Sequence, residues 1–84
     1  PEYVYCGHHG IMAPHNGVIK DYEISDEINK HIFKKIEMLG PDRRINDNLN
    51  ERIAYIYYTY DSKDEMVSAV KNFNNNIKIT FSNE

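Results

Sequence analysis

Residues 52–60 have the sequence Arg-Ile-Ala-Tyr-Ile-Tyr-Tyr-Thr-Tyr. Aromatic and β-branched residues are enriched in strands, so this run predicts a β-strand. Successive side chains in a strand point to opposite faces. One face would carry Ala54, Ile56, Tyr58 and Tyr60, and the other Ile53, Tyr55, Tyr57 and Thr59. Because both faces are largely apolar or aromatic, we predict that this strand lies in the centre of a sheet.

A helix and a final strand are predicted after the central strand. Ser62-Lys63-Asp64-Glu65 is a capping box, in which the serine hydroxyl accepts a backbone N–H and the glutamate reaches back to the cap residue. An apolar stripe at helical spacing follows, formed by Met66, Val67, Ala69, Val70 and Phe73. Three asparagines, 74–76, are expected to end the helix. Ile77, Ile79 and Phe81 then alternate with polar residues, which predicts a half-buried terminal strand.

Two further strands are predicted at the N-terminal end. Residues 2–13 are extended in character, and we expect a bulge or bend at Gly7-His8-His9-Gly10 because glycines often mark such sites. Asn16-Gly17 favours a type I′ turn, with positive φ at both positions. Residues 18–23 should therefore fold back antiparallel on the first strand as an N-terminal β-hairpin.

Residues 25–39 fit two alternatives. Apolar residues recur every three or four positions, which predicts one long helix starting near Ser25. The alternative is a short helix from Ser25 to about His31 and then a strand over 32–39. The inner face of that strand would carry Ile32, Ile36 and Met38, with Lys34 among them. Gly40-Pro41-Asp42 ends whichever element precedes it, and residues 43–51 form a polar connection.

The length and composition are those of one small domain. The chain has 84 residues, among them seven Tyr and three Phe, which is enough large apolar surface for a core without a disulfide or a metal. The pattern predicts an α+β fold in a single domain over residues 1–84: a small, mainly antiparallel sheet with an N-terminal hairpin and one or two helices packed on it.

Charge and hydropathy exclude several partners. A net charge of −3 argues against nucleic acid, because such binding depends on neutralising phosphates. The longest apolar run, residues 53–58, is far shorter than the roughly 20 residues that span a bilayer, so we expect no membrane partner. Cys6 is the single cysteine and no signal sequence is recognisable, so we expect a cytoplasmic protein.

Four candidate metal ligands or nucleophiles lie close together near the N-terminus: Cys6, His8, His9 and His15. A thiolate with imidazoles suits zinc, but this spacing matches no paired-ligand pattern, and adjacent histidines on a strand point to opposite faces. A Cys-His nucleophile would also need an orienting group and an oxyanion pocket. We interpret the four as solvated residues of a bend, and we assign no catalytic, cofactor-binding or metal-ligating residue.

Five short motifs occur in a fixed order over residues 13–80. They are Gly17-Val18-Ile19, Ser25-Asp26-Glu27-Ile28, Gly40-Pro41-Asp42, Arg52-Ile53-Ala54-Tyr55-Ile56 and Ser62-Lys63-Asp64-Glu65. Their order and spacing resemble the C-terminal domain of the carboxylate-amine ligases of the ATP-grasp superfamily, the group of the L-amino acid ligases and relatives of biotin carboxylase. Pro41 departs from that pattern, because such relatives more often place Gly and Asp adjacent. The resemblance favours a helix followed by a strand over residues 25–39.

The resemblance implies a C-terminal accessory domain of a longer ATP-grasp enzyme, in keeping with a chain that starts at Pro1 and not at a methionine. ATP and magnesium would be bound by other domains of the parent enzyme, which would activate a carboxylate as an acyl phosphate and join it to an amine. This chain alone would not be catalytic. It would act as a lid or wall, docked on the ATP-grasp domain through the partly covered face of strand 52–60, while the helix over 66–73 covers the other face. Homodimerisation is left open.

An alternative function is a free-standing regulatory or small-ligand-binding module of the ferredoxin-like type. That fold requires the order βαββαβ. Residues 25–39 would then form a single helix, and the connection over residues 43–51 would contain a strand.

Overall fold

The computed structural model describes residues 4–40 and 42–82, and these form an elongated α+β domain of 51 × 20 × 20 Å. The elements in chain order are β1 (Tyr5–Ile11), β2 (Gly17–Ile24), α1 (Asp26–Asn29), β3 (Ile32–Glu37), β4 (Arg44–Ile45), β5 (Ala54–Tyr60), α2 (Lys63–Lys71), α3 (Phe73–Asn76) and β6 (Ile77–Phe81). The predicted fold class is confirmed. The expected extended residues Glu2 and Tyr3 lie outside the described residues.

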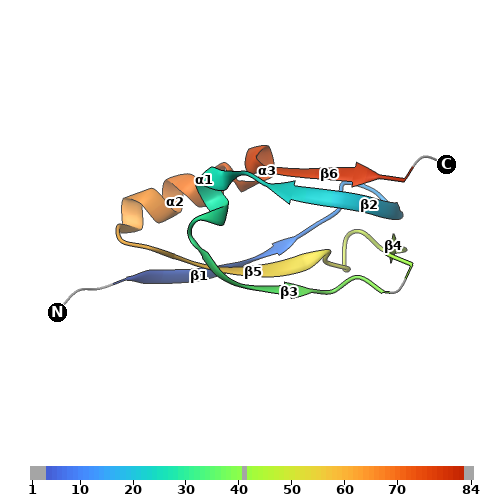
Figure 1. Cartoon of the computed structure of the whole chain (residues 1–84), viewed down its shortest axis with the longest axis horizontal. Helices are drawn as coiled ribbons and strands as arrows, with labels where there is room; N and C mark the ends of the chain where they lie inside the picture. The colour runs from blue at the N-terminus through green and yellow to red at the C-terminus, as the bar shows by residue number, and fades with distance from the viewer. Residues whose placement is uncertain (1–3, 41, 83–84) are drawn as a thin grey trace.

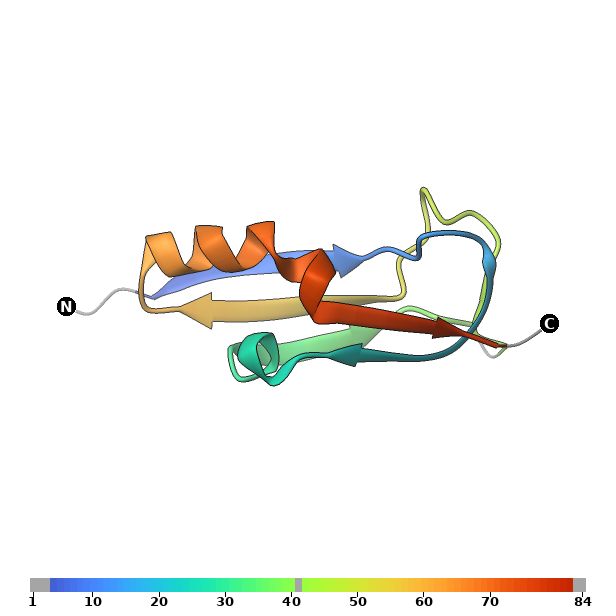
Figure 2. The same cartoon turned by 90° about the horizontal axis from the view of Figure 1, so that it is seen from above.

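The strands form two antiparallel sheets of three strands each. The long sheet has the order β1-β5-β3 and the short sheet the order β4-β2-β6. The long sheet runs along one side of the molecule, and the helices and the short sheet lie over its inner face (Figures 1 and 2). The central position predicted for the strand of residues 52–60 is confirmed, although β5 begins only at Ala54.

The core lies between the long sheet and the layer above it. On β5 the side chains of Ala54, Ile56, Tyr58 and Tyr60 are all buried, whereas Tyr55, Tyr57 and Thr59 are only partly covered. Phe73 of α3 packs edge-on against the Tyr58 ring, with the ring centroids 5.2 Å apart. The other buried hydrophobic residues are Ile11, Ala13, Ile19, Ile28, Ile45 and Ile53. The expected difference between the two faces is therefore present for Tyr55, Tyr57 and Thr59, but Ile53, expected beside them, lies before the start of β5 and is fully buried.

β1 is regular through both of its glycines, so the predicted bulge or bend is wrong. Each glycine instead leaves room for an aromatic ring across the ladder. Gly7 pairs with Tyr58, whose ring occupies the space that a Cβ would take on the inner face. Gly10 pairs with Tyr55, and that ring and the Arg52 side chain cover it. A residue without a Cβ allows this close approach.

The chain reverses between β1 and β2, so the strand-turn-strand order of the N-terminal hairpin is present, but the expected ladder between the two strands is not. β1 pairs with β5 in the long sheet, and β2 pairs with β4 and β6 in the short sheet. The type I′ turn is also wrong. Gly17 has a φ of 148°, but Asn16 is not among the described residues with positive φ. Its side chain instead accepts a hydrogen bond from the Asn48 backbone at 2.8 Å, which joins two loops.

Residues 25–39 form a short helix followed by a strand, so the single long helix is wrong and the alternative is confirmed. The βαββαβ order of a ferredoxin-like fold is therefore absent from the described residues. The expected face of β3 needs a correction, because the register against β5 shifts between Ile32 and Lys34. Ile32 shares the inner face with Tyr58, while Lys34 and Ile36 pair with residues of the outer face. The bulge thus turns Lys34 to the outer face and brings Lys35 and Glu37 to the inner side, where both stay exposed at the edge of the sheet. Met38, also expected on the inner face, follows the end of β3 and is exposed.

Two residues of β3, Lys35 and Glu37, contact Tyr22 of the short sheet. The Tyr22 hydroxyl of β2 donates to Glu37 Oε1 at 2.7 Å, and Lys35 Nζ lies 5.6 Å from the centre of the Tyr22 ring. Burial and the hydrogen bond to Glu37 both raise the pKa of Tyr22. These contacts connect the inner edge of the long sheet to the short sheet.

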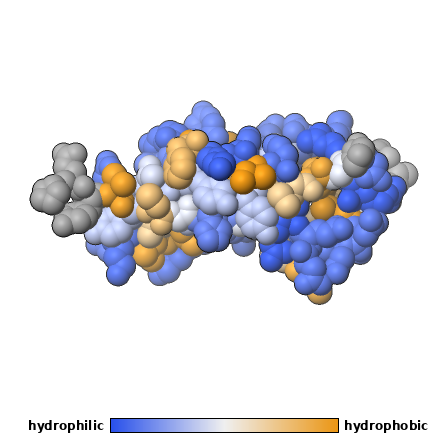
Figure 3. Space-filling model, turned by 90° about the horizontal axis from the view of Figure 1, so that it is seen from below, coloured by the Kyte–Doolittle hydropathy of each residue, from blue (hydrophilic) through white to orange (hydrophobic). Residues whose placement is uncertain are grey.

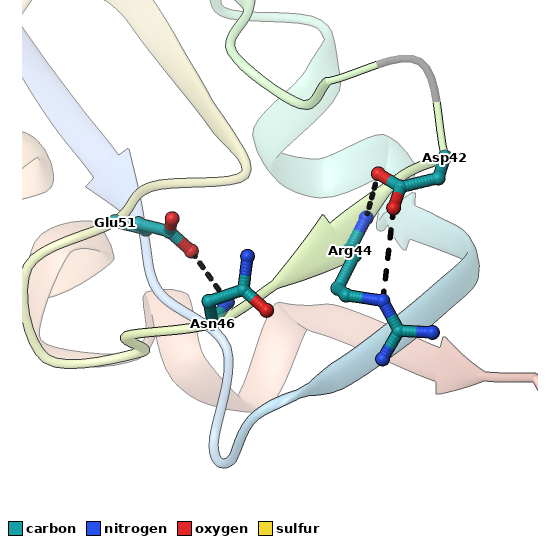
Figure 4. Close-up of polar contacts among 4 residues, drawn as sticks. All are labelled: Asp42, Arg44, Asn46 and Glu51. Atoms are coloured by element: carbon teal, nitrogen blue, oxygen red, sulfur yellow. Dashed lines mark hydrogen bonds and ion pairs between the residues drawn. The ribbon is translucent and has the colours of Figure 1, made fainter.

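The connection over residues 43–51 is ordered by its own side chains (Figure 4). Glu51 accepts backbone hydrogen bonds from Asn46 at 2.8 Å and from Asp47 at 3.2 Å. Asp42 accepts the Arg44 backbone N–H at 3.1 Å and lies 3.6 Å from the Arg44 Nε. The short strand β4 lies within this predicted polar connection, where the ferredoxin-like alternative also requires a strand. Pro41, the departure from the ATP-grasp pattern, lies outside the described residues.

The predicted N-cap of the C-terminal helix is confirmed, but among the described residues no hydrogen bond returns from the Glu65 side chain to complete the capping box. Ser62 is the N-cap of α2, and its hydroxyl accepts the Glu65 backbone N–H at 3.4 Å. The helix ends earlier than expected, at Lys71, and a separate helical turn, α3, spans the three asparagines. The predicted terminal strand is confirmed as β6. Among the described residues, no helix is long and apolar enough to cross a membrane.

Candidate interaction face

The outer face of the long sheet, opposite the helices and the short sheet, is only partly covered in the described chain. Pairing with Tyr55, Tyr57 and Thr59 places Cys6, His8 and Gly10 of β1 and Lys34 and Ile36 of β3 on this face. In the view from below, hydrophobic and weakly polar residues extend along the face among hydrophilic ones (Figure 3). We refer to this surface as the outer face.

Tyr57 lies at the centre of the outer face and has an aromatic or cationic neighbour from each adjacent strand. His8 of β1 lies 5.8 Å from it, centroid to centroid, and Phe33 in the β3 bulge lies 6.4 Å away. Lys34 Nζ is 5.8 Å from the centre of the Tyr57 ring, within the range of a cation–π contact. Phe33 is 62% exposed, so a large apolar side chain stands in solvent beside this group.

The four predicted candidate ligands are dispersed. Cys6 and His8 are on the outer face and Cys6 is exposed, whereas His9 pairs with Ile56 on the inner face. His15 lies in the following loop, where its ring stacks on Phe81 with centroids 3.9 Å apart. Among the described residues, no group of three His, Cys, Asp or Glu side chains could hold a metal ion. The expected opposite orientation of His8 and His9 is confirmed.

His9 is the member of this group with the most restricted surroundings. Its ring packs edge-on against Phe73, with centroids 5.0 Å apart. Burial is the main cause that lowers the pKa of His9 from 6.5, and the nearby positive charges of Arg52 and His8 act in the same direction. The imidazole is therefore predominantly neutral at pH 7.

His31 and Tyr60 form a second aromatic group, at the end of β5 between α1 and α2. Their rings stack with centroids 3.9 Å apart, and His31 Nδ1 lies 3.0 Å from the Thr59 carbonyl oxygen. The Tyr60 hydroxyl is buried and has no hydrogen-bond partner in the part of the chain that the structure describes. Burial raises the pKa of Tyr60. A cleft of about 310 Å³ beside these rings is also lined by the carboxylates of Glu27 and Glu65.

Sequence reasoning missed Phe33, Lys34 and His31 as members of aromatic groups. Local pattern could not find them, because each depends on a partner 23 to 29 positions away, across a ladder or at the end of β5. His31 lies between a helical turn and a strand, and no sequence motif there predicts an aromatic contact.

Comparison of the chain with protein-family models, with curated proteins and with solved structures found no match.

Proposed function

We propose that this chain is a non-catalytic accessory domain of an ATP-dependent carboxylate-amine ligase, and that its outer face docks on the ATP-grasp domain of the same polypeptide. The observation that carries the proposal is the contrast between the two faces of the long sheet. The inner face is closed by helices and the short sheet, while Tyr57 and Phe33 remain partly or largely open on the other side.

The composition of the outer face suits a protein partner. Aromatic residues offer large contact area, and a tyrosine also has a polar tip that tolerates water at the rim of an interface. Tyr57 is held from both sides by His8 and Lys34, so little side-chain entropy is lost when a partner covers it. The centre of the outer face is therefore already held in place before a partner binds.

The identity of the partner rests on the ordered motifs that resemble the ATP-grasp ligases. In such an enzyme the other domains bind ATP and magnesium and form the acyl phosphate. This chain would contribute a wall of the substrate cleft. The proposal assigns no reacting group to it, so its effect on the reaction would come from how it positions the domain it contacts.

Cys6 provides a reporter for the docking, because it is exposed and lies on the outer face, where it pairs with Thr59. The test compares the alkylation rate of Cys6 in this 84-residue chain with its rate in the natural polypeptide isolated with an antibody to the chain. We expect that polypeptide to be much larger than 9.9 kDa, to bind Mg-ATP, and to protect Cys6 at least about tenfold.

A matched pair of variants locates the contact. Tyr57→Ser in the longer polypeptide should restore rapid alkylation of Cys6, while Val67→Ser, on the exposed side of α2, should leave the protection unchanged. Equal alkylation rates in the two proteins would refute docking through the outer face. A natural polypeptide of only 9.9 kDa, or one that does not bind Mg-ATP, would refute the ligase assignment.

A further inference from the structure

A pocket lies between the end of β1 with the residues that follow it and the α3–β6 segment, where β1 and β6 are each an edge strand of their sheets. It has a volume of about 470 Å³ and is lined by residues 9–14 and by Asn74, Ile77 and Ile79. Small-molecule sites in proteins have about 300–1,000 Å³ and mostly apolar walls with a few polar groups. We call this the β1–β6 pocket.

Two side chains give the β1–β6 pocket its polar groups. They are the His9 imidazole of β1 and the Asn74 amide of α3. Neither side chain forms a hydrogen bond with any residue that the structure describes. His9 is held in place by its edge-on contact with Phe73, at 5.0 Å between ring centroids. An ordered imidazole and a carboxamide are thus both free to bind a ligand.

The charges around the β1–β6 pocket favour an anion. No Asp, Glu, Lys or Arg side chain is among the lining residues, so His9 is the titratable group of the wall. The charged groups that act on His9 are Arg52 and His8, and both are cationic or become so on protonation. This contrasts with the cleft beside Tyr60, where Glu27 and Glu65 would repel an anion.

We propose that the β1–β6 pocket binds a small carboxylate with an apolar body. The ring or alkyl chain of the ligand lies against Ile77 and Ile79, and its carboxylate accepts hydrogen bonds from the His9 ring N–H and the Asn74 amide. The inference does not depend on the proposed docking, because His9 points away from the outer face.

The test uses the chain itself, with benzoate as the probe, followed by NMR. Benzoate should cause saturable shifts of the Gly10, Asn74 and Ile79 amide signals at millimolar concentration. Acetate lacks the body and benzyl alcohol lacks the charge, so each should bind at least about tenfold more weakly. Because a bound carboxylate stabilises the imidazolium, benzoate should raise the pKa of His9.

The same strand supplies the matched control. His9→Gln should weaken benzoate binding about tenfold, whereas Cys6→Ser, on the opposite face of β1, should bind as the wild type does. Asn74 is exposed, so Asn74→Ala keeps the test valid if His9→Gln does not fold. The proposal is overturned if benzoate shifts no signal saturably, if it binds no better than benzyl alcohol, or if neither pocket variant weakens it.

Discussion

Gly7→Ala should destabilise the chain although alanine is the better residue for a strand. A Cβ on Gly7 would lie 2.6 Å from the Tyr58 hydroxyl oxygen and 2.7 Å from two carbons of the ring. Real Cβ contacts essentially never come below 3.0 Å, so something must move. Tyr58 is only 4% exposed and sits edge-on between Phe73 and Tyr60, which leaves the ring little room to yield.

Two opposing terms set the magnitude of the Gly7→Ala effect. Overpacking a core costs about 1–3 kcal/mol, and replacing glycine where the backbone permits it returns about 0.4–1 kcal/mol through the unfolded state. The net expectation is a loss of about 1–2 kcal/mol in the free energy of unfolding. For a domain of this size, that corresponds to a Tm lower by roughly 5–15 °C.

Thermal melts and urea titrations of Gly7→Ala and Gly40→Ala decide the matter. At Gly40 the nearest atom to a new Cβ is Asp42 Oδ1 at 3.9 Å, an ordinary contact, so that control should match or slightly exceed the wild type. Combining Gly7→Ala with Tyr58→Leu should show a favourable coupling, because the smaller side chain removes the clash. The reasoning fails if Gly7→Ala melts at or above the wild-type temperature.

Two further predictions concern a helix cap and pH. Ser62→Ala removes the hydroxyl that accepts the Glu65 N–H and should lower the free energy of unfolding by about 0.5–1 kcal/mol in urea titrations, while Ser68→Ala on the same helix should have little effect. The pKa of His9 in the folded chain lies below 6.5, so the unfolded chain binds a proton more readily. The contribution of His9 to the free energy of unfolding should therefore be fully present above about pH 6.5 and decrease as the pH falls towards the folded pKa. His9→Gln should make the urea midpoint less dependent on pH between about 5.5 and 7.5, and an unchanged slope would contradict this assignment.

Most elements were predictable from sequence because their signals are local. The alternation of Tyr and Ile over residues 52–60 found the central strand, and Ser62 with Glu65 found the start of α2. The partners of the strands could not be predicted in the same way. The turn between β1 and β2 predicts that they pair, but the ladders with β5 and β6 join residues 43 to 62 positions apart, and no local pattern predicts such distant pairing.

The glycines of β1 show a different limit of sequence reasoning. Gly7 and Gly10 were interpreted through the backbone freedom that glycine has, which predicted a bulge. The structure uses them for the space that a missing Cβ leaves, under Tyr58 on one face and under Tyr55 and Arg52 on the other. Either role requires a glycine in the sequence, so only the pairing of β1 with β5 shows which role applies.

The bulge of β3 connects this limit to the candidate interaction face. Strict alternation from Ile32 would place Lys34 and Ile36 on the inner face with it. One extra residue between Ile32 and Lys34 exchanges the faces of all later side chains, so Lys35 and Glu37 take the inner positions at this edge of the sheet, where both contact Tyr22 of the short sheet. Lys34 then lies over Tyr57, and Phe33 is left 62% exposed beside it. The exposed aromatic group on which the docking proposal rests is thus a consequence of this shift in register.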